Sequence, residues 1–158
     1  SLSQRVLGVG QQIAQIDRRL AQMMGRNESH RKVVELVGPA VGAVLFARLG
    51  RLRDYPGAEA LEIACGLQRV PRRRAQAGVA VRITRRGARQ VRSYLSQAAS
   101  SWIQRDPVVR AWYQQRSGDA EATRQLAAGA VMKKLVRALW HAANGEQYEA
   151  RRLFDARR

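Results

Sequence analysis

Arginines dominate the middle of this 158-residue sequence, and their chemistry favours phosphate binding. Residues 63–105 contain ten arginines and no acid. A guanidinium fork can pair with phosphate through two hydrogen bonds, whereas an ammonium group makes a point contact. Apolar residues lie among the arginines (Leu67, Val70, Val91 and Leu95), which indicates a folded surface and not a basic tail. The candidate phosphate-binding residues are the nine arginines between 69 and 92, namely Arg69, Arg72, Arg73, Arg74, Arg82, Arg85, Arg86, Arg89 and Arg92.

The overall charge points in the same direction. A net charge of +17 and a pI near 11.7 indicate a nucleic acid as the first partner and an anionic membrane surface as the second. No apolar run approaches the ~18 residues that a membrane span needs. Hydrophobic residues make up 46% of the sequence, which is enough for a core, and the length fits one domain with or without an appendage.

Cysteine usage and the N-terminus place the chain in a broad class. Cys65 is the only cysteine, so an internal disulfide is excluded and a reducing cytoplasm is expected. It lies in an apolar stretch, which predicts a buried, inert thiol. We find no signal-peptide pattern, and the sequence begins Ser-Leu-Ser without methionine, as a segment of a longer protein would.

The elements that must position the arginines begin with a heptad repeat over residues 2–24. Two apolar series with seven-residue spacing form an a/d seam, which predicts one long helix. Either this helix packs on its own domain, or it forms a coiled coil with a partner, most simply in a homo-oligomer. We therefore divide the chain into a coiled-coil helix, residues 1–25, and a helical domain, residues 26–158. The seam consists of Val6, Val9, Ile13, Ile16, Leu20 and Met23.

Two short helices are predicted between residues 26 and 50. Ser29 is the expected cap of the first helix, Gly38 and Pro39 form the turn, and Gly50 ends the second helix. Helix-hairpin-helix modules have this pattern, and in them the hairpin amides can hold a phosphate. Gly38 is therefore a candidate nucleic-acid-binding residue, although a plain helical turn has the same signature.

The remaining sequence predicts an all-α fold with one irregular region. A short helix is expected from Pro56 to Cys65, followed by a loop or hairpin over residues 67–83 with a possible brief strand at its end. Thr84 and the pair Asp106-Pro107 are predicted to begin the next two helices. A last long helix should begin with Asp119 and Glu121 and end at Asn144-Gly145. The expected buried faces consist of Val91, Leu95, Ala98 and Trp102, then Val109, Trp112 and Tyr113, then Val131, Leu135, Ala138, Leu139 and Ala142.

Catalytic signatures are missing from the sequence. His30 and His141 have no partner at metal-ligand spacing, and the twelve acids form no close pair of the kind found in two-metal nucleases. Four serines (Ser93, Ser96, Ser100 and Ser101) fall on a predicted helix with no adjacent base, so solvated side chains are expected. The residues alone therefore predict a binding module.

Six motifs in order resemble the C-terminal half of the IS-one-ten insertion-sequence transposases, relatives of the Piv invertases. These enzymes are bridge-RNA-guided DNA recombinases. The hairpin around Gly38 is similar to the family's Pro-Gly-Val-Gly-Pro, with Leu36 at the first glycine. The motifs are Ile13-Ala14-Gln15-Ile16-Asp17; Leu36-Val37-Gly38-Pro39 with Leu45-Phe46-Ala47-Arg48-Leu49-Gly50; Asp54-Tyr55-Pro56 through Ala64-Cys65-Gly66-Leu67; Ile83-Thr84-Arg85-Arg86-Gly87 with Val91-Arg92; Asp106-Pro107 with Trp112-Tyr113; and Met132-Lys133-Lys134-Leu135 with Gly145-Glu146-Gln147-Tyr148.

The resemblance implies a DNA recombinase whose serine attacks a phosphodiester, but two family features lack a counterpart here. One is the RuvC-like domain, whose four acids are expected to hold Mg²⁺. The other is the nucleophilic serine, because Ala77 occupies the matching place and no serine lies between Cys65 and Ser93. The resemblance also implies DNA and a structured guide RNA as partners, no cofactor within this chain, and a cytoplasmic location on the bacterial nucleoid.

The sequence thus predicts an all-α, nucleic-acid-binding domain of a transposase that does not cleave DNA by itself. One alternative is a non-catalytic DNA- or RNA-binding protein descended from such a transposase. Another is a protein–protein module that acts through the heptad seam.

Overall fold

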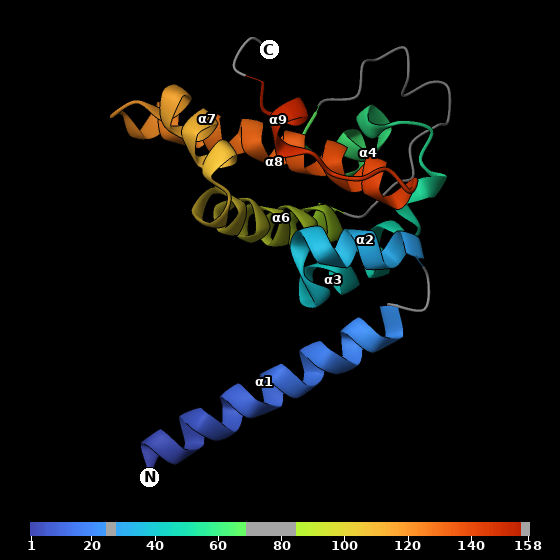
Figure 1. Cartoon of the computed structure of the whole chain (residues 1–158), viewed down its shortest axis with the longest axis vertical. Helices are drawn as coiled ribbons and strands as arrows, with labels where there is room; N and C mark the ends of the chain where they lie inside the picture. Colours follow the sequence, from blue (N-terminus) through green and yellow to red (C-terminus); the bar gives the residue numbers. More distant parts are fainter. Residues whose placement is uncertain (25–27, 69–84, 156–158) are drawn as a thin grey trace.

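The computed structural model describes residues 1–24, 28–68 and 85–155, and within these ranges the regular elements are all helices, joined by turns and short irregular segments (Figure 1). The predicted all-α class is therefore confirmed. The strand considered at the end of the irregular region lies outside the described residues. The elements are α1 (Leu2–Met24), α2 (Glu28–Val37), α3 (Pro39–Leu49), the 3₁₀ turn η1 (Leu52–Asp54), α4 (Ala58–Ala64), α6 (Arg85–Arg105), α7 (Pro107–Ser117), α8 (Glu121–Ala143) and α9 (Ala150–Leu153).

Helix α8 is the centre of the helical body. It contacts α2, α4, α6 and α7, which surround it (Figure 1). Its predicted stripe is buried, with Val131 and Leu135 fully inaccessible. Each such aliphatic side chain contributes about 1.5–3 kcal/mol through burial, so α8 holds together elements that are far apart in the sequence.

Helix α6 buries the predicted face against α8 and α3. Val91 and Leu95 are inaccessible, and Trp102 is 6% exposed. The Trp102 ring contacts Phe154 edge-on, with ring centroids 5.2 Å apart. The Phe154 ring in turn meets the Trp112 ring at 5.4 Å, in the edge-to-face arrangement that aromatic pairs prefer. These contacts fix the end of the chain to α6 and α7.

The observed helix ends match the predicted ones where the capping contact is made by a residue next to the helix. The Asp106 carboxylate accepts hydrogen bonds from the amides of Val108 and Val109, at 2.9 and 3.4 Å, and Pro107 is the first residue of α7. Gly50 ends α3 with φ of 72°. Ser29, however, is not a cap, because α2 already begins at Glu28.

One other start differs from the predicted residue, because helix α4 begins at Ala58, after Gly57, and not at Pro56. Helix α8 begins at Glu121, one of the two predicted residues, with Ala120 at the capping position, so Asp119 lies just outside the helix. The Asp119 carbonyl accepts a hydrogen bond from Arg124 instead. The predicted cap Thr84 lies outside the described residues.

Helices α2 and α3 form the predicted hairpin, joined by Gly38 alone. Gly38 has φ of 84°, a region that residues with a Cβ rarely adopt, and Pro39 starts α3. The His30 ring from α2 lies on the Phe46 ring from α3 at 4.1 Å. This histidine therefore helps to hold α2 against α3.

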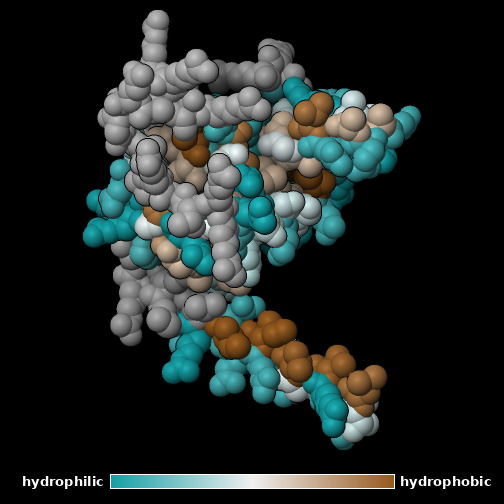
Figure 2. Space-filling model, turned by 180° about the vertical axis from the view of Figure 1, so that it is seen from behind, coloured by the Kyte–Doolittle hydropathy of each residue, from teal (hydrophilic) through white to brown (hydrophobic). Residues whose placement is uncertain are grey.

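Helix α1 projects from the helical body, with its N-terminal end farthest from it (Figure 1). It contacts α2 and α3. Yet the seam residues Val6, Val9, Ile13 and Ile16 are 53–64% exposed. Figure 2 shows their part of α1 as an uncovered apolar stripe along one side of the helix. Intramolecular packing thus leaves these four of the six seam residues open, while the side chains of Leu20 and Met23 lie outside the described part. The division at residue 25 remains a prediction.

None of the described helices is long and apolar enough to cross a lipid bilayer.

Candidate nucleic-acid interface

The predicted arginine site falls between α4 and α6. Five of its members, Arg69, Arg72, Arg73, Arg74 and Arg82, lie outside the described residues, as does Ala77. Arg85 and Arg86 form the start of α6, but their side chains are not described. Arg89 is exposed on α6, and Arg92 is partly buried. The described part of the site therefore consists of the end of α4, the first turns of α6, and their neighbours.

The chain leaves α4 through a tight, glycine-dependent turn. The Leu67 amide donates to the Glu62 carbonyl at 3.0 Å, and the Gly66 amide donates to the Ile63 carbonyl at 2.9 Å. These two bonds form a Schellman motif, and Gly66 adopts the left-handed conformation that this motif needs, with φ of 72°. A Cβ on Gly66 would lie 2.5 Å from Nη1 of Arg92. The turn thus brings the Arg92 guanidinium close against the end of α4.

A buried carboxylate lies in the last turn of α4. Glu62 is inaccessible to solvent, although it is ionisable. Its Oε1 accepts a hydrogen bond from Nε of Arg137 on α8 at 2.8 Å, and its Oε2 accepts one from the Gln68 side-chain amide. Because an unpaired buried carboxylate is very costly, these partners explain how Glu62 can lie in the core. They also fix Gln68, the residue that precedes Arg69.

Cys65 lies beside this carboxylate and is buried, as expected. Burial, followed by the nearby Glu62 charge, raises the pKa of the Cys65 thiol to about 12. Since the thiolate is the reactive form, this side chain is a packing residue and not a nucleophile.

A second described arginine flanks α6 from α3. Nε of Arg48 donates to Oε1 of Gln90 at 2.7 Å, which places an exposed guanidinium next to the helix that carries Arg89. Neither α3 nor α6 contains an acid. Ser93, Ser96 and Ser100 are exposed on α6, in agreement with the expected solvated side chains. The described surface here is therefore basic and polar, with no carboxylate on either helix.

The Gly38 turn offers fewer amide donors than expected. The Gly38 amide itself donates to the Val34 carbonyl at 2.7 Å, and Pro39 has no N–H. At the start of α3, only the amides of Ala40 and Val41 remain outside the helical ladder. A phosphate contact at Gly38 is therefore still a prediction, and it would have to use these two neighbours.

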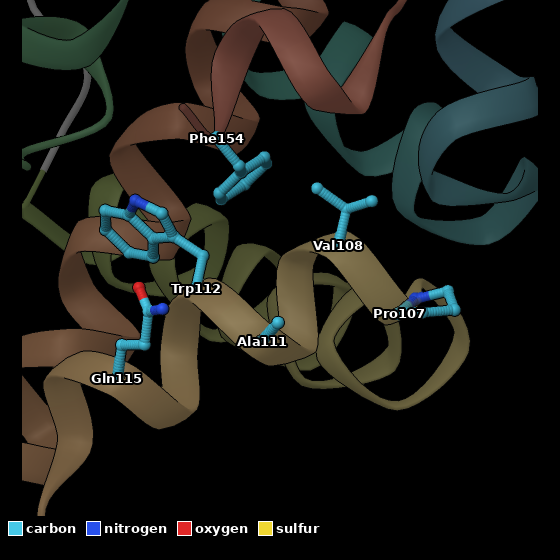
Figure 3. Close-up of a pocket in the computed structure, with 6 residues that line it drawn as sticks. All are labelled: Pro107, Val108, Ala111, Trp112, Gln115 and Phe154. Atoms are coloured by element: carbon cyan, nitrogen blue, oxygen red, sulfur yellow. The ribbon is translucent and has the colours of Figure 1, made fainter. Parts of the chain in front are cut away.

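Two hollows of the described chain lie away from this region. One of about 320 Å³ is lined by α7 and Phe154 (Figure 3). Its walls include Val108, Ala111 and the Trp112 ring, and Gln115 is its one side-chain amide. Another, of about 420 Å³, contains Lys32, whose Nζ already donates to the Gly145 carbonyl at 2.6 Å. Among the residues placed by the structure, no group of three or more His, Cys, Asp or Glu side chains could hold a metal.

Sequence reasoning missed two basic residues that the fold brings to this region, Arg48 and Arg137. The sequence did contain one sign that a basic residue would lie here. Glu62 is the one acid in the apolar stretch from Leu61 to Leu67, and a carboxylate on a buried helix face requires a cation nearby. Which cation it would be could not be read from the sequence, because Arg137 is 75 positions away.

Comparison with known proteins identifies the family of the chain. No curated protein and no solved structure matches the chain significantly. The model of one family, described as Transposase IS116/IS110/IS902 family, matches residues 34–114. This range is just over half of the chain, and it runs from α2 to α7, so it includes α3 with Arg48 and α6 with Arg89. The chain therefore belongs to the IS116/IS110/IS902 family of transposases, which gives it a role in DNA transposition.

Proposed function

We propose that this chain binds the sugar-phosphate backbones of DNA and of a structured guide RNA on behalf of a transposase. The acid-free stretch over residues 63–105, which begins directly after buried Glu62, carries the proposal. Exposed Arg89 and Arg48 line its described part, and a net charge of +17 supplies a long-range attraction for polyanions. Phosphate contacts of this kind give affinity without base specificity.

In the proposed reaction of the intact enzyme, a serine hydroxyl attacks a DNA phosphodiester. The new bond joins the serine oxygen to phosphorus, and the displaced DNA end leaves as a hydroxyl. Ala77 occupies the matching position here and carries only a methyl group. Mg²⁺ is assigned to the acids of a RuvC-like domain, so no residue of this chain is given that role. This chain would then hold the nucleic acid, and cleavage would need other parts.

Ala77 also favours a second candidate, a non-catalytic DNA- or RNA-binding protein descended from a transposase. Both candidates use the same basic surface, so binding assays do not separate them. An upstream reading frame with the four acids of a RuvC-like domain would identify a transposase. The cytoplasm, in association with the nucleoid, is the proposed location in either case.

The exposed seam of α1 supports a proposal of homo-oligomers through a coiled coil. Four apolar residues at heptad spacing are more than half exposed, and a partner helix would remove them from water. A pure protein–protein module would rely on this seam alone. In that case nucleic-acid binding would be weak and nonspecific.

Salt-dependent binding tests the proposed function. Six to ten phosphate contacts lose about 10³ to 10⁵ in affinity between ~50 and ~200 mM salt. Replacing Arg85, Arg86 and Arg89 with alanine should weaken binding to all sequences and flatten the salt slope. A matched control replaces three exposed arginines outside this region, Arg124, Arg151 and Arg152, and removes the same charge. Equal curves for the two triple variants would move the binding surface away from α6.

A further inference from the structure

The buried pair Glu62–Arg137 has a geometry that a purely structural ion pair does not require. Glu62 is fully buried, but the Arg137 side chain is 55% exposed. Only its Nε points to the carboxylate, at 2.8 Å. The guanidinium therefore forms a link between the core and the surface of α8.

The terminal nitrogens of Arg137 remain available for a ligand. They carry four N–H donors, and within the described chain we find no acceptor for them. Because Glu62 holds Nε, the guanidinium plane is fixed before a ligand arrives. A fixed, half-exposed fork of this kind suits the oxygens of a phosphate group.

The location of this fork connects it to the candidate interface. Gln68, which shares the Glu62 carboxylate, is the last described residue before Arg69. The Arg92 guanidinium lies against Gly66, about one helical turn from Glu62. Guanidinium groups from α6 and α8 thus flank the end of α4, and one buried carboxylate offsets only part of their charge.

We infer that Arg137 binds a backbone phosphate of the nucleic acid and that Glu62 is the residue that positions it. This inference rests on the proposed function and extends the surface to α8. It adds a contact outside the arginine stretch that the sequence singles out. Gln68, at the point where the chain leaves α4, donates a hydrogen bond to the same carboxylate. Glu62 therefore positions both the phosphate-binding Arg137 and the segment that follows α4.

Arg137→Gln tests the contact, with Arg124→Gln as the control. Both arginines lie on α8 and pair with a glutamate, and their exposures are similar, 55% and 47%. They are about 20 Å apart along the helix axis. Binding of a DNA or RNA oligonucleotide is measured for the wild-type chain and for each variant. Relative to wild type, R137Q should lower the affinity about tenfold and reduce the salt slope by about one. R124Q should leave both nearly unchanged.

Glu62→Gln tests the positioning role through the sign of its effect. If only charge mattered, removing an acid beside a phosphate would strengthen binding. If Glu62 orients Arg137, E62Q should weaken binding several-fold, while the salt slope falls by less than in R137Q. Thermal melts identify any variant that fails to fold. If E62Q does not fold, the comparison of R137Q with R124Q decides alone. If R137Q does not fold, because the buried Glu62 carboxylate has lost its cation, the sign of the effect of E62Q decides.

The outcomes separate this inference from the proposed function. A steep wild-type slope with identical R137Q and R124Q curves would refute the contact and leave the function standing. Tighter binding by folded E62Q would refute the positioning role. A wild-type chain that binds no oligonucleotide at low salt would overturn both.

Discussion

Gly66→Ala tests the turn from which the candidate site is built. Alanine in the left-handed conformation costs roughly 1–2 kcal/mol. The new Cβ would also lie 2.5 Å from Nη1 of Arg92, but this atom is the end of a flexible side chain and can move. The conformational term should therefore dominate the loss of stability. At about 2–4 °C per kcal/mol for a chain of this length, the melting temperature should fall by roughly 2–8 °C.

Gly57→Ala is the matched control, because it lies at the other end of the same helix. Gly57 has an extended backbone with φ of −172°, and no atom lies within 4 Å of an added Cβ. Thermal unfolding followed by circular dichroism should therefore show almost no change for G57A. Equal melting temperatures for G66A and G57A would refute the reasoning. Nucleic-acid binding by folded G66A should also weaken, since Arg92 has to leave its position against α4.

Three further predictions concern the caps, the seam and position 77. Asp106→Ala removes both capping hydrogen bonds of α7 and should cost about 1 kcal/mol, or roughly 2–4 °C in a thermal melt. Ala120→Asp supplies a cap that α8 lacks and should raise the melting temperature by a similar amount; two unchanged melts would contradict the capping argument. Ile13→Asp with Ile16→Asp should lower the mass measured by light scattering while the rest of the chain melts as before, and a monomeric wild type at high concentration would exclude self-association. Ala77→Ser in this chain alone should form no covalent DNA adduct on denaturing gels, whereas in a full-length protein with its guide RNA it should form one; an adduct of the full-length Ala77 protein would move the nucleophile elsewhere.

Local signals in the sequence predicted most of the fold. The cap at Asp106 depends on a side chain and on amides two and three residues away, so its sequence pattern is sufficient. The buried faces of α6 and α8 follow from helical periodicity, which says which side of a helix is apolar. The start of α4 was predicted two residues too early, because Gly57 occupies the capping position without a side-chain hydrogen bond.

Long-range pairings could not be predicted in the same way. Periodicity gives the buried face of α8 but not the element that covers it, so the contact between Arg137 and Glu62 was invisible. The same holds for Arg48, whose hydrogen bond to Gln90 joins α3 to α6. The sequence thus located the arginine stretch, and the fold added two guanidinium groups from other helices to its edges.

Under the proposed function, the residues that would bind nucleic acid are different from the residue that would attack it. The end of α4 is fixed by Glu62, Gly66 and Arg92, and none of these contacts involves position 77. A serine at that position would add a hydroxyl group without changing the net charge or any of these anchors. The salt slope of binding depends on the number of neutralised phosphates, and a neutral hydroxyl does not alter that number. Under the proposed function, the same scaffold would therefore serve an active transposase and a binding protein without a nucleophile, and the residue at 77 would distinguish the two only when the remaining catalytic parts are present.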